Sequence, residues 1–521
     1  MNHTGTREPA LTEQVRIRVG GQDLDSAHAS ALATITVRGI VSTATSAQLE
    51  FINPPASGGL SLGDEIAIRH DSASVPLFRG PITAVSDDHD GAGKLVRTVR
   101  AYDALQALRV HAPVRMFVEL TTAELAGELL GDAAIKLIAD ADSPVWHRIC
   151  QWSRSDLALL RDVAGRTGTY FQLQPQAQNP ALRLFSAEGY GDVIDLTMGD
   201  HLLHARTESN ADVARGEVQA SAWDPQTSAV FATQAQASAS AGLASMQGVV
   251  ANVAGLTVQG QSATQAHAEA VVGRRQAHAE HVHGCARGNA NLACGRKVRF
   301  RGLGDAFERP FMLTEVVHRI DRLEGFRTEF ATQPPPQTNN PYGLLVTLGE
   351  VVAVDDPESL GRVCVSLPVM QDIETSWLQI MHPAAGAGGK GFVAVPDRGD
   401  QVLVLLFESD PAHGIVLGGL FGQDLDADVG VEGDQVVQHL WRSKAGQVIR
   451  LSDKESMVSL VNEEGSEFKI APDLMSMADA HGNEVKLTSA EVSIHAATNM
   501  LIEAPGKALT IRAASIDFER G

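Results

Sequence analysis

Six short triplets mark the C-terminal stretch of this chain, residues 446–521: Val458-Ser459-Leu460, Phe468-Lys469-Ile470, Val485-Lys486-Leu487, Val492-Ser493-Ile494, Leu509-Thr510-Ile511 and Ile516-Asp517-Phe518. Each triplet places a polar residue between two apolar ones, which is the period-2 pattern of a strand with one buried face. Turn-forming residues separate the triplets, among them Gly465, the Gly482-Asn483 pair and the Pro505-Gly506 pair. The stretch therefore predicts a run of short strands joined by tight turns.

A single chain of such strands has a narrow apolar stripe and little else on which to bury it, because short isolated strands are marginal in water. Winding several copies around a common axis lets each stripe face the others. Repeats at a regular spacing are typical of stacked repeat architectures, so we predict an intertwined, threefold β-helical needle. Layers of an ordinary β-sandwich remain the alternative. The predicted trimer core consists of Val458, Leu460, Phe468, Ile470, Val485, Leu487, Val492, Ile494, Leu509, Ile511, Ile516 and Phe518.

The bulk composition narrows the class of protein. A chain of 521 residues is too long for one hydrophobic core, and several domains are expected. The formal net charge of −21 disfavours nucleic acid or an anionic membrane as a direct partner. The 4 cysteines do not make a disulfide framework in a chain of this length. The N-terminus lacks an apolar signal-peptide core, so we expect synthesis in the cytoplasm without a signal peptide.

The first two segments differ in their period. Residues 1–110 hold short alternating strands with turn signals between them, which indicate a first small β-barrel or sandwich. Residues 111–206 switch to a helical period and form an α/β part. One helix there starts with a capping box from Thr121 to Glu124, and a second is capped by Ser155.

Residues 207–332 contain the least informative stretch. An Ala/Ser/Gln-rich run at 232–247 is read as a flexible insertion or a surface loop, and we assign it no function. Residues 262–279 have a helical composition, and a second small β-barrel follows them.

The C-terminal half begins at a linker. Residues 333–341 are rich in proline and predict a semi-rigid spacer. Residues 342–422 have the size and strand number of an OB-fold barrel, and residues 423–521 are the β-helical spike. The strand signals in the barrel lie at 343–354, 362–367, 376–381, 392–395, 401–407 and 414–420.

This order of parts resembles the VgrG family and the related hub-and-spike proteins of phage tails. The resemblance in the N-terminal half is carried by Phe78-Arg79-Gly80-Pro81-Ile82, Val99-Arg100-Ala101-Tyr102-Asp103-Ala104-Leu105, Ser155-Asp156-Leu157-Ala158-Leu159-Leu160, Gly165-Arg166-Thr167-Gly168, Cys294-Gly295-Arg296-Lys297-Val298 and Val316-Val317-His318. In the OB part it is carried by Pro383-Ala384-Ala385-Gly386, Pro396-Asp397-Arg398-Gly399-Asp400-Gln401-Val402-Leu403-Val404 and Ser409-Asp410-Pro411. Together with the C-terminal repeats, these motifs cover the whole chain.

The resemblance implies a mainly β, multi-domain fold: a hub of two small β-barrels with a helical insertion, an OB-fold barrel and a C-terminal intertwined trimeric β-helix. It also implies a homotrimer. Two barrels per chain, in three copies, make a pseudo-sixfold ring that caps a hexameric inner tube while the spike stays threefold. Sheath contraction then drives tube and spike through a target envelope. Type VI secretion systems, extracellular contractile particles and phage tails all use such a part.

The partners implied by the resemblance are a hexameric inner tube or tube adaptor protein, baseplate proteins and a separate PAAR-like conical tip protein. The tip protein is expected on the end formed by Ile516, Phe518, Arg520 and Gly521. Effector proteins are further partners that the resemblance allows, and no nucleic acid is expected. Contact with the target membrane is expected only when the spike punctures it. The protein is expected to be made in the bacterial cytoplasm, assembled into a particle baseplate, and delivered outside the cell or into the target.

Catalytic and metal chemistry find little support in the residues. His278, His281, His283, Cys285 and Cys294 suit zinc by type, but there is no CxxC pair and we expect no metal or other cofactor. Gly386-Ala387-Gly388-Gly389-Lys390-Gly391 lacks the first glycine and the Ser/Thr of a phosphate loop. The protein is therefore predicted not to be an enzyme. The alternatives are a phage-type tail spike with cell-wall hydrolase activity and a trimeric β-helical host-binding fibre.

Overall fold

The computed structural model describes residues 15–55, 60–71, 73, 75–131, 133, 135–152, 154–174, 180–213, 216–224, 229–237, 250–257, 260–336, 343–421 and 430–519. The chain is mainly β and separates into two compact units, Met1–Leu420 and Phe421–Gly521. Among the described helices, none is both long and apolar enough to cross a membrane.

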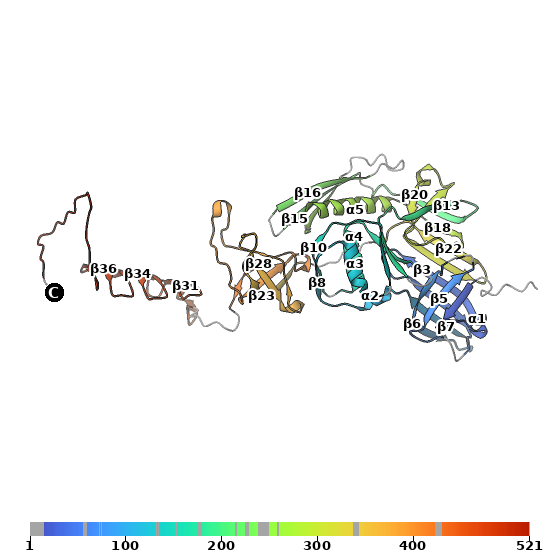
Figure 1. Ribbon diagram of the computed structural model, residues 1–521, viewed down its shortest axis with the longest axis horizontal. Coiled ribbons are helices and arrows are strands. Elements are labelled where there is room, and N and C mark those ends of the chain that lie inside the picture. Colours follow the sequence, from blue (N-terminus) through green and yellow to red (C-terminus); the bar gives the residue numbers. More distant parts are fainter. Residues whose placement is uncertain are drawn as a thin grey trace, which may run out of the picture. The chain divides into compact units, whose positions relative to one another are not determined.

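One antiparallel sheet of eleven strands organises the first unit, in the order β14-β18-β22-β21-β3-β4-β7-β6-β5-β1-β2 (Figure 1). The strands of residues 15–102 and those of residues 202–331 join where β3 pairs with β21, which places Ile35 opposite Ile320. Each half thereby satisfies the open main-chain edge of the other. The bounds are β1 Val15–Val19, β2 Gln22–Asp23, α1 Ser26–Ala31, β3 Leu32–Ile40, β4 Ser46–Ile52, β5 Glu65–His70, β6 Phe78–His89, β7 Leu95–Tyr102, β14 Leu202–Ser209, β18 Glu280–Arg287, β21 Glu315–Asp321 and β22 Gly325–Ala331.

The two halves of this sheet curl around separate hydrophobic cores. Ile66 and Phe78 lie in the first core. Phe300, Phe311 and Phe330 lie in the second, where the rings of Phe300 and Phe330 stack with centroids 5.4 Å apart. A small sheet closes the second core and consists of β13 Tyr190–Thr197, β19 Arg296–Arg301 and β20 Pro310–Met312, with the short helix η3 Asp305–Phe307 beside it.

A helical part follows the first half of the sheet. The predicted capping box is confirmed, because Thr121 caps α3 and the Glu124 side chain accepts from the Thr121 backbone. The Ser155 cap of α4 is also confirmed, with Oγ accepting from the Ala158 N–H at 3.3 Å. The elements are α2 Gln106–Val110, β8 Arg115–Leu120, α3 Thr122–Leu130, β9 Lys136–Ala139, β10 Trp146–Gln151, α4 Asp156–Arg166, β11 Tyr170–Gln174 and β12 Ala181–Phe185.

The Ala/Ser/Gln-rich region contributes a small sheet and a long helix. The predicted helix is confirmed as α5, Gln261–Ala279, which lies along β15 and β16 (Figure 1). The prediction of a flexible insertion or surface loop at 232–247 is wrong for residues 232–236, which belong to a paired strand of this sheet, and residues 238–247 lie outside the described residues. The sheet has the order β16-β15-β17, with β15 Glu217–Asp224, β16 Ala229–Gln236 and β17 Val250–Thr257.

The OB part is a six-stranded sheet in the order β25-β24-β23-β27-β28-β26, wrapped around a core that includes Val351, Val404 and Leu406. The strand predicted at 392–395 is wrong, because that segment lies in a long excursion without a partner strand. The elements are β23 Leu345–Ala353, β24 Cys364–Leu367, η4 Pro368–Met370, β25 Ile373–Glu374, β26 Gln379–Ile380, η5 Ala387–Gly389, β27 Gln401–Leu406, η6 Phe407–Ser409 and β28 Gly414–Leu420.

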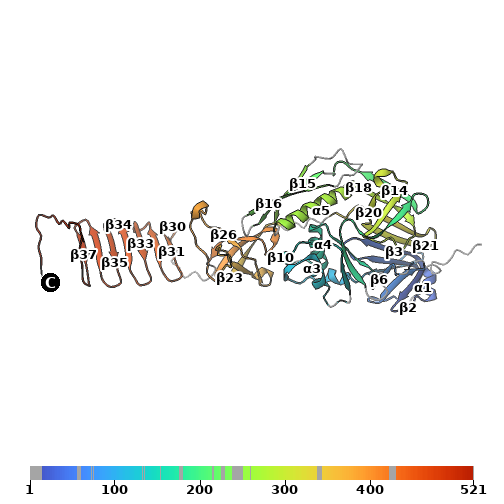
Figure 2. The same cartoon turned by 45° about the horizontal axis from the view of Figure 1, so that its top comes forward.

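The second unit is a seven-stranded antiparallel meander, in which the strands follow one another as a ladder (Figure 2). Four predicted triplets are confirmed as parts of β33, β34, β36 and β37, whereas those at 509–511 and 516–518 form no strand because nothing in one chain pairs with them. The strands are β31 Gln438–Arg442, β32 Val448–Ser452, β33 Met457–Val461, β34 Glu467–Ala471, β35 Leu474–Ala478, β36 Glu484–Thr488 and β37 Val492–His495, preceded by the hairpin β29 Val431–Glu432 and β30 Gln435–Val436.

Candidate functional site

The register of the meander gathers its apolar residues on one face. Residues directly opposite each other in an antiparallel pair lie on the same side of a sheet. Two columns of such residues run across all seven strands, and every member except His439 is apolar. We call these columns the apolar face: Trp441, Ile449, Leu460, Phe468, Met477, Val485 and Ile494 in one, and His439, Leu451, Val458, Ile470, Met475, Leu487 and Val492 in the other.

Nothing in the described part of the second unit covers this face. Eleven of its side chains are between 38% and 70% exposed, which is far from the near-complete burial of a core residue. A hollow of about 650 Å³ lies at one end of these strands, lined by Trp441, Leu460 and Phe468 of the apolar face together with Val461 and Glu467 of the opposite face. A contiguous apolar patch of this length on a folded chain marks an interaction surface.

The opposite face is polar. Its central column alternates cations with serines, in the order Arg450, Ser459, Lys469, Ser476, Lys486 and Ser493. Ser459 and Ser476 are buried on this side, whereas their neighbours Leu460 and Met477 on the apolar face are exposed. The sheet therefore has one side suited to water and one side suited to contact.

The structure places the predicted spike residues unevenly. Eight of the twelve lie on the apolar face, whereas Leu509, Ile511, Ile516 and Phe518 lie beyond the last strand and are exposed. Phe518 is 94% exposed. Of the predicted tip contacts, Arg520 and Gly521 fall outside the described residues.

Five apolar residues of the same face were missed from the sequence: Trp441, Ile449, Leu451, Met475 and Met477. Leu474-Met475-Ser476-Met477 alternates too weakly in polarity to be found by its period, since Leu474 turns to the polar side. Val448-Ile449-Arg450-Leu451 has the same mixed pattern. The even step between the confirmed triplets was the one signal that could have placed these strands.

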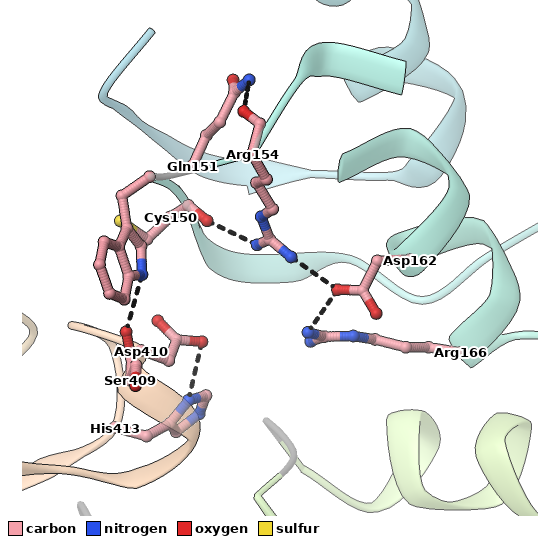
Figure 3. A network of polar contacts seen from close by, with 9 residues as sticks. Cys150, Gln151, Arg154, Asp162, Arg166, Ser409, Asp410 and His413 are labelled. Atoms are coloured by element: carbon pink, nitrogen blue, oxygen red, sulfur yellow. Dashed lines mark hydrogen bonds and ion pairs between the residues drawn. The ribbon is translucent and has the colours of Figure 1, made fainter. Parts of the chain in front are cut away.

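A second set of contacts fastens the OB barrel to the helical part within the first unit (Figure 3). The Trp152 indole Nε1–H donates to the Ser409 carbonyl at 3.0 Å, and its ring packs against the barrel core. Arg148 donates from Nη1 to the Thr375 carbonyl at 2.7 Å. These bonds cross from β10 and the loop after it to the OB sheet, so the two parts form one body.

Charged groups surround this junction. Asp162 on α4 accepts from Arg154 Nη1 and from Arg166 Nη2, each at 2.9 Å (Figure 3). Burial raises the pKa of the Asp162 carboxyl, but the two guanidinium groups outweigh it and hold that pKa below its ordinary value. Burial also raises the pKa of Asp410, but His413 Nδ1 at 3.3 Å, the Ala412 N–H at 2.9 Å and the charge of Arg166 together hold that pKa below its ordinary value. Both carboxylates therefore stay ionised near neutral pH and act as fixed partners of cations.

The candidate zinc ligands are dispersed. His281 Nε2 lies 3.7 Å from Glu208, and His278 Nδ1 lies 3.0 Å from the Gln333 amide. Cys294 is buried elsewhere, with Sγ 3.7 Å from the Thr314 carbonyl. Within the described ranges, no three His, Cys, Asp or Glu side chains are placed to share a metal ion.

Two family models match separate parts of this chain. The Alg8 N-terminal domain matches residues 56–322, which is just over half of the chain. The type VI secretion system/phage-baseplate injector OB domain matches residues 347–421. No curated protein matches the sequence.

Several solved structures share the fold at low identity. An Escherichia coli type VI secretion component, c3393, described as similar to T4 tail proteins gp27 and gp5, is 13% identical with a TM-score of 0.52 and covers 78% of this chain and 99% of its own. The Francisella PdpA–VgrG complex in its lidded form is 8% identical with a TM-score of 0.56, covering 92% and 79%. The lidless complex is 8% identical with a TM-score of 0.55, covering 92% and 98%. The chain therefore belongs to the Alg8 N-terminal domain family, contains a segment that matches the injector OB domain, and has the fold of VgrG-like hub-and-spike proteins.

Proposed function

We propose that three copies of this chain form a needle that caps the inner tube of a contractile injection system and pierces the target envelope when the sheath contracts. The observation that carries the proposal is the apolar face, which runs unbroken over seven strands and is left half-exposed by one chain. In the needle, the three apolar faces turn toward a common axis.

The free energy available from this contact is large. Full burial of an aliphatic or aromatic side chain is worth about 1.5–3 kcal/mol, so each half-exposed member of the face has about 1 kcal/mol still to gain. Eleven such side chains give on the order of 10 kcal/mol per chain. Three chains together gain on the order of 30 kcal/mol, which meets or exceeds the roughly 8–30 kcal/mol needed to immobilise two partners.

A threefold needle also suits the proposed mechanical task. With the strands lying across the axis, the ladder hydrogen bonds run along it, and six strand spacings of about 4.8 Å give a rigid section of about 29 Å. The polar faces, with Arg450, Lys469 and Lys486, point to water. No long strand edge then runs along the side of the needle where it could unzip.

The same geometry supports a separate tip protein. The sheet ends at β37, whose Val492 and Ile494 are strongly exposed, and the following segment exposes Ile516 and Phe518. We propose that a PAAR-like conical protein covers this end. At the other end, the two half-barrels of the first unit, in three copies, supply six similar contacts for a hexameric tube or its adaptor. Because a VgrG occurs in complex with PdpA in a solved relative, an effector is a further proposed partner.

Light scattering on the purified full chain tests the trimer. The expected mass is about 166 kDa, three times the 55.3 kDa of one chain, and a particle of one chain mass at micromolar concentration contradicts the needle. A dye-leakage assay on lipid vesicles tests the mechanical role. The purified trimer should release no dye, whereas contracting particles should, and release by the trimer alone would favour a membrane-active protein instead.

A further inference from the structure

A long excursion leaves the OB barrel between β26 and β27. We call residues 381–400 the arm, and it projects from the barrel in both views (Figures 1 and 2). Apart from the single short turn η5 the arm forms no helix or paired strand, and connections of this length with so little secondary structure are uncommon in compact domains unless they have a function. The arm contains the glycine-rich run 386–391 that fails as a phosphate loop and has no role in the needle.

The arm has a defined shape although it packs on little. The Gly386 N–H donates to the Lys390 carbonyl at 2.8 Å, and the Phe392 N–H donates to the Pro383 carbonyl at 3.0 Å. Gly391 has φ +144°, and a Cβ there would lie 2.8 Å from the Ala385 Cα, so this turn requires glycine. Such internal bonds hold the arm in one conformation before it meets a partner.

The arm shows its apolar side chains to solvent. Every residue from 381 to 400 except His382 and Pro396 is exposed. Met381 is 58% exposed and Val393 is 64% exposed. A shaped segment with uncovered apolar side chains is typical of a contact with another surface.

A matching apolar patch lies on the outer wall of the same barrel. Val402, Val404 and Leu406 of β27 fill the barrel core, so the alternating residues of β27 and of its neighbour β23 point outward. Toward one end of the two strands these outward residues are also apolar, and Val346 and Leu348 of β23 are more than half exposed. The outer patch consists of Val346, Leu348, Leu403, Leu405 and Ile415, which the register places in adjacent rows.

We propose that the arm of each copy lies on the outer patch of the next copy around the threefold axis. This inference rests on the proposed trimer. One chain carries both surfaces and leaves the arm, Val346 and Leu348 exposed and the rest of the outer patch partly exposed, so we place the contact between copies. A contact between two different surfaces closes into a ring when the copies are related by threefold rotation.

Chain connectivity and charge favour a second copy as the occupant. Residues 421–437, between β28 and the seven-stranded sheet, reach at most about 60 Å when fully extended. Three barrels tethered to one needle therefore meet at a high effective concentration. The arm carries Lys390 at its tip, and the outer wall carries the exposed Glu350 two residues after Leu348, so the ends of the contact are opposite in charge.

Disulfide trapping in the full chain tests the contact. The double variant V393C/L348C should form covalently linked dimers and trimers on mild oxidation, seen on denaturing gels, whereas each single variant should not. The matched control is V393C/L323C, because Leu323 is 90% exposed but lies in the turn between β21 and β22, and it should stay unlinked. A trimer by light scattering in which V393C/L348C links no more than its controls overturns the arm contact and leaves the needle intact.

Limited trypsin digestion gives an independent readout at Lys390 and Arg398, which are both in the arm. In the wild-type trimer these bonds should be protected, and L348E should speed their cleavage by tenfold or more. Equal cleavage rates in wild type and L348E contradict the proposal. If the wild-type chain is monomeric, the proposed needle itself fails, which distinguishes the two cases.

Discussion

A lysine at Leu460 should prevent assembly of the needle, whereas a lysine at the next residue should not. Leu460 lies in β33 on the apolar face, between Ile449 on one neighbouring strand and Phe468 on the other. Val461 points to the opposite, polar face, where Glu467 is its direct cross-strand partner. The two variants L460K and V461K therefore make the same kind of change one residue apart, and only the face differs.

The expected penalty follows from burial. Leu460 is 44% exposed in one chain, so about 1 kcal/mol of burial is lost per chain when it is replaced. An ammonium group in the closed interior costs several kcal/mol more, and three of them meet near one axis. The total is on the order of 10 kcal/mol or more for the trimer. V461K instead places its charge in water beside Glu467, where such a pair is worth about 0–1 kcal/mol.

Light scattering and thermal unfolding of both variants provide the assay. L460K should have the mass of one chain at concentrations at which wild type is a trimer, and its C-terminal sheet should lose heat resistance. V461K should match wild type in mass and in melting temperature. A trimeric L460K with unchanged melting, or equal disruption by both lysines, would refute the assignment of the apolar face to the trimer interior.

Two further substitutions test the first unit. In the β6–β7 pair, G80A should destabilise the hub by about 3 kcal/mol or more through overpacking, because a Cβ there would lie 2.0 Å from the Tyr102 carbonyl oxygen. The control is G91A in the same hairpin, where no atom lies within 4 Å of an added Cβ. Equal unfolding midpoints of the two variants in urea would count against this prediction. In the OB barrel, Arg362 donates to both carboxylate oxygens of Asp356 at 2.9 and 2.7 Å, and both side chains are nearly fully buried. R362Q should therefore lower the free energy of unfolding by about 3–5 kcal/mol, and the double variant D356N/R362Q should lower it less. The hydrogen bonds from Arg362 hold the pKa of Asp356 well below its ordinary value. The stability that the ionised Asp356 contributes is therefore present above about pH 4 and is lost as the pH falls through the folded-state pKa. Wild type should lose more stability in acid than R362Q, and equal losses in the two proteins would contradict the pairing.

Local features of this chain could be predicted from its sequence because they depend on neighbours a few residues apart. The period-2 triplets predicted β33, β34, β36 and β37. The Thr121 capping box and the Ser155 cap likewise depend only on residues within one turn of a helix. The order of these local signals along the chain was sufficient to indicate a VgrG-like fold, which the matched injector OB domain and the similar solved structures confirm.

The candidate site could be predicted only in part. The alternation of apolar and polar residues indicates which residues share one face of a strand, but it does not indicate which strands pair with each other. Met475 and Met477 belong to the apolar face because they pair with Ile470 and Phe468. The polarity pattern of their own segment does not predict this pairing. Conversely, the alternating residues at 509–511 and 516–518 have a strand pattern without a partner strand in one chain. Their role in the trimer core and at the tip stays a prediction.

By itself, the sequence determined the strand-rich character of the chain, its helix caps, its mainly β domains and the apolar alternation of its C-terminal stretch. Only the tertiary structure decided that Ile35 pairs opposite Ile320, so that both hub halves share one sheet. It alone placed residues 392–395 in an exposed arm instead of a strand. The physical reason is that main-chain hydrogen bonds between distant segments depend on which open edges come together in space, and no local pattern encodes that choice.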